Sequence, residues 1–190
     1  REWIDQQWLA QAFFYTLHVA GGTKLVLLVH AAALVGGIAL ALAAAVSLGA
    51  SRRSVWLAAG ACLALAPWVL QMRSQTLAVP LFVGILWLLA ADSRNPSRRV
   101  LLSLPLLALW ANVHGTVVLG VVLVSLRGLT AVVSALRGRT TRESGRRGAV
   151  LLLAAPACIF ASPYGFELFG YYQSLLLNPM LKSMIDEWGV

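Results

Sequence analysis

Four polar side chains of this chain have the types and the setting for chemistry at a membrane surface. Asn112 and His114 lie in an Asn-x-His-Gly motif, at a corner between two apolar runs. His114 can donate a hydrogen bond to a phosphate or carry a proton between groups. Arg73 lies between two other apolar runs and can hold a phosphate with two parallel hydrogen bonds. Asp5 can act as a general base, or bind a divalent metal ion together with a phosphate.

Each of these residues also has a simpler structural explanation. Asp5 can cap a helix or be solvated, and Arg73 can extend its guanidinium to lipid phosphates. His114 can end a turn by bonding a carbonyl oxygen. Tyr164, which follows a proline, is typical of a turn with an aromatic ring at the membrane interface. Because no single residue decides between these explanations, their collection on one side of the membrane carries more weight.

The composition is that of an integral membrane protein. Apolar residues make up 59% of the 190 positions and charged residues 12%, whereas soluble domains carry about 25% charge. The net charge is +8, but the basic residues fall in short loops between apolar runs, which indicates membrane topology and no nucleic-acid partner. Cys62 and Cys158 each lie inside an apolar run, so we expect small core residues and neither a disulfide nor a metal pair.

The apolar runs predict an all-α fold, a polytopic transmembrane helical bundle with interfacial helices on its outer face. A crossing takes about 20 residues, and the expected spans cover approximately residues 25–49, 55–70, 76–91, 100–111, 116–136 and 149–161. The fourth and sixth are short, either because they line a site, as broken spans do in transporters, or because ordinary spans have trimmed ends. Residues 1–23 suit an interfacial helix that Gly21 and Gly22 stop, and the tail 166–190 suits another, broken at Asn178 and Pro179.

The distribution of basic residues predicts the orientation. The loops after the first, third and fifth expected spans hold most of the arginines: Arg52, Arg53, Arg94, Arg98, Arg99, Arg137, Arg139, Arg142, Arg146 and Arg147. The opposite side holds only Arg1, Lys24, Arg73 and Lys182. Because short cytoplasmic loops are rich in Lys and Arg, we expect a multi-pass protein of the plasma (inner) membrane with both ends of this chain extracytoplasmic. We also expect residues 1–190 to form a single membrane-embedded domain, a fragment of a longer protein.

The expected outer face gathers acids, amides, histidine and tyrosine, whereas the inner face is mostly arginine. The outer set consists of Glu2, Asp5, Gln6, Gln7, Gln11, His18, Gln71, Arg73, Gln75, Asn112, His114, Tyr164, Glu167, Asp186 and Glu187. Chemistry is therefore expected on the outer face. His30, about two turns into the first expected span, is a further candidate, because an ionisable residue inside a membrane is functional by default. A neutral imidazole bonded to a neighbouring helix explains it equally well.

Several short motifs follow one another along the chain: residues 3–11 (WIDQQWLAQ), residues 73–75 (RSQ), residues 109–115 with Gly120, residues 162–165 (SPYG), and Glu187 with Trp188. Together, in order and spacing, they resemble bacterial polytopic membrane proteins related to the GT-C (polyprenyl-phosphate-dependent) glycosyltransferase superfamily. The resemblance covers most of the chain. It departs from the pattern at Gln7, where relatives often have Glu, at Ser74, where they often have Pro, and at Ser162, where Asn is common.

The resemblance implies an integral membrane glycosyltransferase that moves a sugar from a polyprenyl-phosphate donor to an extracytoplasmic acceptor. Such enzymes keep an acidic residue in the first outer loop as a base or metal contact, and Asp5 has that position here. By the same resemblance, Arg73, His114 and Asn112 would face the donor phosphate. The residues bordering the site would be Trp3, Trp8, Gln7, Tyr164 and Glu187. The cofactor is left open, with a divalent metal ion as one option.

Two other function classes stay open. A lipid or solute transporter would explain the short spans and His30, although the two halves of the chain show no inverted repeat. A non-catalytic membrane subunit would pack through small residues, such as those at 36–37 and 41–45, and would tolerate replacement of Asp5 and Arg73. The expected partners are membrane lipid, a polyprenyl-phosphate-linked sugar and, for a subunit, other membrane chains.

Overall fold

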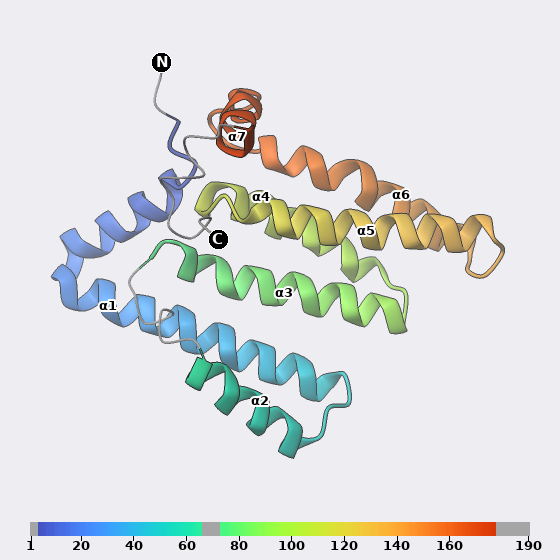
Figure 1. Cartoon of the computed structure of the whole chain (residues 1–190), viewed down its shortest axis with the longest axis horizontal. Helices are drawn as coiled ribbons and strands as arrows, with labels where there is room; N and C mark the ends of the chain where they lie inside the picture. Colours follow the sequence, from blue (N-terminus) through green and yellow to red (C-terminus); the bar gives the residue numbers. More distant parts are fainter. Residues whose placement is uncertain (1–3, 66–72, 178–190) are drawn as a thin grey trace.

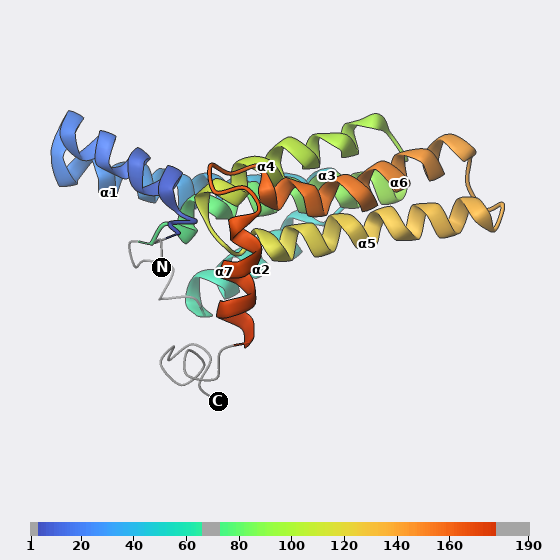
Figure 2. The same ribbon diagram turned by 90° about the horizontal axis from the view of Figure 1, so that it is seen from above.

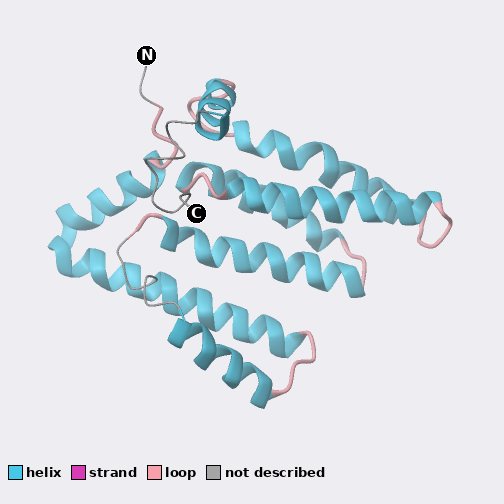
Figure 3. Cartoon of the chain, viewed as in Figure 1, coloured by secondary structure: helices cyan, strands magenta, loops and turns pink. Residues whose placement is uncertain are grey.

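The computed structural model describes residues 4–65 and 73–177, and this part of the chain is all-α, with no strand (Figures 1 and 3). The elements are α1 Trp8–Ser47, α2 Arg52–Leu65, α3 Gln75–Arg94, the short 3-10 helix η2 Arg98–Leu102, α4 Ser103–Val113, α5 Val117–Leu136, α6 Arg142–Ala157, the 3-10 helix η3 Cys158–Phe160, and α7 Glu167–Leu177. The all-α prediction is confirmed. Asn178 and Pro179, where we expected a break in the tail, lie outside the described residues.

The helices run back and forth between two ends of the molecule (Figure 1). The α1–α2, α3–η2 and α5–α6 connections lie at one end, which we name the arginine end (residues 47–52, 92–99 and 137–147). The start of α3, the α4–α5 corner and the segment after α6 lie at the other, the corner end (residues 4–8, 73–75, 112–116 and 161–171). Figure 2 shows α7 turning away from the axis of α6 at the corner end.

Three helices of the described chain, α1, α3 and α5, are long and apolar enough to cross a membrane. The fourth and sixth expected spans correspond to shorter helices, α4 with 11 residues and α6 with 16, against roughly 17 for a crossing. The structure is thus consistent with a membrane protein, and the arrangement with six spans remains a prediction.

Helix α1 is broken at the predicted place. Gly21 and Gly22 have non-helical backbone angles, and Gly22 adopts a φ of +67°, a conformation that glycine reaches without steric cost. The chain therefore changes direction between residues 8–20 and 23–47, as Figure 1 shows. The first segment exposes large apolar side chains, including Tyr15 at 71% and Val19 at 68%. Such a segment suits the membrane interface, which stays a prediction.

Helix α6 begins well before the apolar run that predicted it. We expected a span from residue 149, but the helix starts at Arg142, so much of the expected basic loop is helical. The hydroxyl of Thr141 accepts a hydrogen bond from the main-chain N–H of Ser144 (3.2 Å), and Glu143 lies in the first turn. A side-chain cap and an early acidic residue both stabilise a helix start, whatever the polarity of the turn that follows.

The core lies among α3, α4, α5 and α6, where Ile85, Leu107, Val124 and Leu151 are at most 1% exposed. Helices α5 and α6 approach most closely at two glycines. A Cβ atom on Gly128 would lie 2.6 Å from the carbonyl oxygen of Gly148, well inside contact distance. Small residues at such a crossing let two helix backbones touch, which is a common source of packing energy in membranes.

Replacing Gly128 by alanine should separate α5 from α6, because the new methyl group meets backbone atoms that cannot rotate away. We expect Gly128→Ala to lower the free energy of unfolding by about 1–3 kcal/mol. Gly36→Ala is the matched control, since a Cβ there meets nothing within 4 Å and alanine favours a helix by up to about 1 kcal/mol. Reversible unfolding in detergent measures both. Equal stability of the two variants would contradict the tight crossing.

Candidate functional site

The side chain of Asn112 joins three segments at the corner end. Its Oδ1 accepts a hydrogen bond from Trp8 Nε1 at 2.8 Å. Its Nδ2 donates to the carbonyl oxygens of Ala108 at 2.8 Å and Ala161 at 2.6 Å. The residue is 9% exposed, and an amide nitrogen has two hydrogens to donate. Both hydrogens are therefore used inside the protein, which gives Asn112 a positioning role between α1, α4 and the segment after η3.

Asp5 lies in the turn that precedes α1. Its Oδ1 accepts hydrogen bonds from the main-chain N–H of Gln7 at 3.0 Å and from Gln11 Nε2 at 3.2 Å. The first of these is the bond of an Asx turn, in which an aspartate accepts from the residue two positions later. Among the described residues, none donates a hydrogen bond to Oδ2. Asp5 thus shapes the turn through Oδ1, and Oδ2 makes no hydrogen bond to a residue that the structure describes.

Gln7 connects this turn to the start of α3. The hydroxyl of Ser74 donates a short hydrogen bond to Gln7 Oε1, and Arg73 is the exposed residue directly before Ser74. The amide of Gln7 therefore has a structural role here, because it joins the turn before α1 to the residue that precedes α3.

Gln6 contacts both α7 and the α4–α5 corner. Its Nε2 donates to the hydroxyl of Tyr171 at 2.9 Å. Its Oε1 is buried with no hydrogen-bond partner in the described chain, and a Cβ on Gly115 would lie 2.4 Å from it. The glycine of the Asn-x-His-Gly motif is therefore required for the close approach of the Gln6 amide.

The phenol groups of α7 stay neutral near this amide. Burial raises the pKa of Tyr171, the negative charge of Asp5 raises it further, and the hydrogen bond with Gln6 lowers it. Burial, with a smaller contribution from Tyr171, raises the pKa of Tyr172 to about 12. Because Gln6 donates to the hydroxyl of Tyr171, α7 belongs to the same polar site as the turn before α1.

His114 has a defined ring orientation. The main-chain N–H of Thr116 donates to His114 Nδ1 at 3.2 Å, and the hydroxyl of Thr116 lies 2.9 Å from the same nitrogen. Since Nδ1 accepts from the main-chain N–H of Thr116, the imidazole is held against the first residues of the turn into α5. His114 thus lies in a turn, as its simpler explanation expected, but its Nδ1 contacts Thr116 and not a carbonyl oxygen.

The remaining predicted site residues fall into two groups. Tyr164 lies in the turn before α7, where its N–H approaches Ser162 Oγ at 3.5 Å and its carbonyl accepts from Glu167 N at 3.0 Å. This is the turn role that its sequence context indicated. Trp3 and Glu187 lie outside the described residues. The structure therefore links Asp5, Gln7, Trp8 and Asn112 by hydrogen bonds, directly or through one neighbour, and leaves Tyr164 in a turn.

The sequence did not single out Tyr171, which completes the site from α7. The only sequence signal for it is its position soon after the predicted turn at residues 162–165. A metal site gains no support: the described residues contain no group of three or more His, Cys, Asp and Glu side chains that could hold an ion.

A second buried polar cluster lies toward the arginine end. Arg127 Nη2 forms an ion pair with Asp92 Oδ2 at 2.6 Å and also donates to the carbonyl oxygen of Asp92 at 3.0 Å. The main-chain N–H of Ser97 donates to Asp92 Oδ1 at 2.8 Å. Asp92 is 5% exposed, so its charge is compensated by contacts with α5 and with the turn after α3. This cluster connects α3 to α5.

No protein-family model, no curated protein and no solved structure matches this chain. The observations that bear on function are therefore the two polar clusters and the helices that carry them. Membership of the GT-C group remains an expectation from the motifs.

Replacing Asn112 by aspartate tests the contacts of its amide. The new carboxylate would face the carbonyl oxygens of Ala108 and Ala161, and we expect Asn112→Asp to cost about 3 kcal/mol of unfolding free energy at pH 7. Trp8→Phe, which removes one hydrogen bond and keeps the ring packing, should cost only about 1–2 kcal/mol.

The loss in Asn112→Asp should depend on pH. Burial raises the pKa of the introduced carboxyl group in the folded state, so the loss is smallest below the unfolded pKa of about 3.9. It then grows as pH rises toward the folded-state pKa. Unfolding measured from pH 3 to 8 follows this change. A loss that is the same at every pH would mean that the side chain at position 112 reaches water.

Proposed function

We propose that this chain belongs to a membrane-embedded transferase that passes a sugar from a polyprenyl-phosphate donor to an acceptor at the corner end. The observation that carries the proposal is the geometry of Asp5. One of its oxygens is held by Gln7 and Gln11, while Oδ2 has no hydrogen bond within the described chain. A carboxylate that is oriented through one oxygen and accessible through the other suits a general base.

The proposed reaction is a single displacement. Asp5 Oδ2 takes the proton of the acceptor hydroxyl, whose oxygen forms a bond to the anomeric carbon of the sugar. The bond from that carbon to the phosphate oxygen breaks, and its electron pair leaves with the polyprenyl phosphate. Because attack and departure occur on opposite faces, the configuration at the sugar carbon inverts.

The leaving phosphate requires positive charge and hydrogen-bond donors. Arg73 lies next to Ser74, which is bonded to the turn that holds Asp5, and a guanidinium can donate two parallel bonds to a phosphate. His114, at the α4–α5 corner, is the second candidate donor to the phosphate. Asn112 acts through other residues in this proposal, because it holds Trp8 and the segment after η3 in place.

The proposal includes an orientation. The arginine end faces the cytoplasm of the plasma membrane, as short loops rich in arginine do, and the corner end faces outward. This orientation is supported by the positions of the loops in Figure 1, where the α1–α2, α3–η2 and α5–α6 connections lie at one end of the molecule.

The experiment is an assay of sugar transfer by the full-length protein in proteoliposomes, with a panel of labelled polyprenyl-phosphate sugars. We expect Asp5→Asn to lower the transfer rate by about 10²–10⁴-fold, because the amide keeps the Oδ1 acceptor for Gln7 and Gln11 but cannot take a proton. Arg73→Ala should weaken binding of the donor by about tenfold or more.

The matched control is Glu143→Gln, the same loss of a carboxylate at the arginine end. The side chain of Glu143 is 61% exposed, and its partners among the described residues are Arg98 and Arg147, so its loss should leave transfer unchanged. Full transfer activity in both Asp5→Asn and Arg73→Ala would refute the proposal.

A second candidate function, transport of a lipid or solute, is favoured by His30. This residue is 5% exposed within a helix long enough to cross a membrane, and its Nε2 is buried with no hydrogen-bond partner in the described chain. Ionisable residues in such positions mark transport pathways in many membrane proteins. Flux across proteoliposomes without covalent change of the substrate, lost in His30→Leu and kept in Asp5→Asn, would support this candidate over the transferase.

A further inference from the structure

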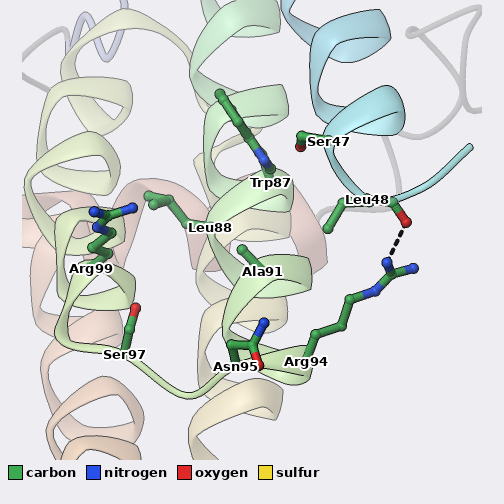
Figure 4. Close-up of a pocket in the computed structure, with 9 residues that line it drawn as sticks. All are labelled: Ser47, Leu48, Trp87, Leu88, Ala91, Arg94, Asn95, Ser97 and Arg99. Carbon is green, nitrogen blue, oxygen red and sulfur yellow. Dashed lines mark hydrogen bonds between the residues drawn. The ribbon is translucent and has the colours of Figure 1, made fainter.

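A pocket opens at the arginine end, on the opposite side of the bundle from the proposed transfer site. Its cavity volume is about 520 Å³, which falls in the range of about 300–1,000 Å³ typical of small-ligand sites. It lies between the end of α1 and the turn from α3 to η2, as Figure 4 shows. The lining residues are Ser47, Leu48, Trp87, Leu88, Ala91, Arg94, Asn95, Ser97 and Arg99.

The charge of this pocket is positive and uncompensated. Arg94 and Arg99 line it, and none of the acidic residues that the structure describes does. The nearby acids are engaged elsewhere, since Asp92 is paired with Arg127 and Glu143 lies between Arg98 and Arg147. The pocket therefore attracts an anion.

The two arginines differ in how they are held. Arg94 reaches toward the end of α1, where its Nη1 donates a short hydrogen bond to the carbonyl oxygen of Leu48 (Figure 4). Arg99 is exposed and makes no hydrogen bond or ion pair with a described residue. One guanidinium is thus fixed by the fold at one wall of the pocket, and the other keeps its donors for a ligand.

The lining of the pocket favours a ligand with a polar part and an apolar part. The helices α1 and α3 both end here, and both are long and apolar enough to cross a membrane. The polar residues Arg94, Asn95 and Ser97 lie at the end of α3 and directly after it, whereas half-buried Trp87 and Leu88 lie about two turns further into the helix. Tryptophan is enriched where lipid headgroups meet acyl chains, so the pocket crosses that boundary.

We propose that this pocket binds an anionic phospholipid of the membrane leaflet at the arginine end. The phosphate binds Arg99, Arg94 adds positive charge at the opposite wall (Figure 4), and the glycerol and upper acyl chain contact Trp87 and Leu88. Basic pockets between helices bind anionic headgroups by this combination of charge and apolar contact. The proposal does not depend on the transfer chemistry, because no residue is shared between the two sites.

The experiment measures lipid binding to the full chain in phosphatidylcholine nanodiscs that carry increasing amounts of phosphatidylglycerol. Bound lipid is counted by native mass spectrometry after release, and a photoactivatable phosphatidylglycerol maps the contact. We expect crosslinks at residues 87–99. We expect Arg99→Gln to weaken phosphatidylglycerol binding about tenfold, which corresponds to about 1.4 kcal/mol, and to leave phosphatidylcholine binding unchanged.

Arg139→Gln is the matched control. Arg139 is an exposed arginine at the same end, outside the pocket, and its side chain likewise makes no bond to a described residue. Neither substitution removes a protein contact, so both variants should unfold at the same temperature as the unmodified chain. An equal loss of bound phosphatidylglycerol in Arg99→Gln and Arg139→Gln would show that only the overall surface charge matters. This result would overturn the proposal.

Two more results would overturn it. Unchanged binding of phosphatidylglycerol in Arg99→Gln would show that the Arg99 guanidinium does not contact the lipid. Displacement of phosphatidylglycerol by millimolar inorganic phosphate would mean that a soluble phosphate, without apolar contacts, is the better ligand. Arg94→Gln is the second variant, and it should weaken phosphatidylglycerol binding as well.

Discussion

The corner end depends on one buried amide. Asn112 bonds at once to the indole of Trp8, to its own helix at Ala108 and to the carbonyl of Ala161. In a low-dielectric surrounding these hydrogen bonds are strong, and an unpaired amide would be costly. The position of the start of α1 relative to α4 and the segment after η3 therefore depends strongly on a single side chain. Asp5 precedes and His114 follows the helices that this amide joins, whereas Arg73 is connected to the same site through the bond of Ser74 with Gln7.

The opposite half of the bundle is organised by a charge pair. Asp92 and Arg127 connect α3 to α5 in a buried setting, where removal of one partner leaves an uncompensated charge. The pair also fixes geometry, because Asp92 bonds both to Arg127 and to the main-chain N–H of Ser97 in the turn after α3. The charge of Asp92 is thus compensated by Arg127 and not by the arginines of the neighbouring pocket. Near each end of the bundle, one buried polar contact thus determines which polar side chains are engaged within the protein: the bonds of Asn112 at the corner end and the Asp92–Arg127 pair toward the arginine end.

Sequence patterns predicted the elements well where apolar runs and glycines mark them. The break at Gly21 and Gly22, the corner after α4 and the approximate extents of α3 and α5 all follow from local chemistry. The start of α6 was missed because polar residues 142–147 form its first turns, stabilised by the Thr141 cap. Hydrophobicity identifies the membrane-facing part of a helix and does not locate its capped end.

The site was predicted less completely than the fold. Asp5, Asn112 and Arg73 were identified by type, but the pairing of Asn112 with Trp8 and of Gln6 with Tyr171 joins residues distant in sequence. Such contacts depend on helix packing, which a single sequence does not specify. The role of Gly115 shows the same limit, since its lack of a side chain is explained only by the Gln6 amide beside it.

The bond between Trp8 and Asn112 joins residues separated by 104 positions. A ribosome therefore releases the first segment of α1 long before the partner that fixes it exists. The break at Gly21 and Gly22 separates this segment from residues 23–47, so the long apolar part of α1 can reach its place independently of the segment before it. Assembly of this chain is consequently ordered in time, because the turn before α1 reaches its final place only after α4 has been synthesised.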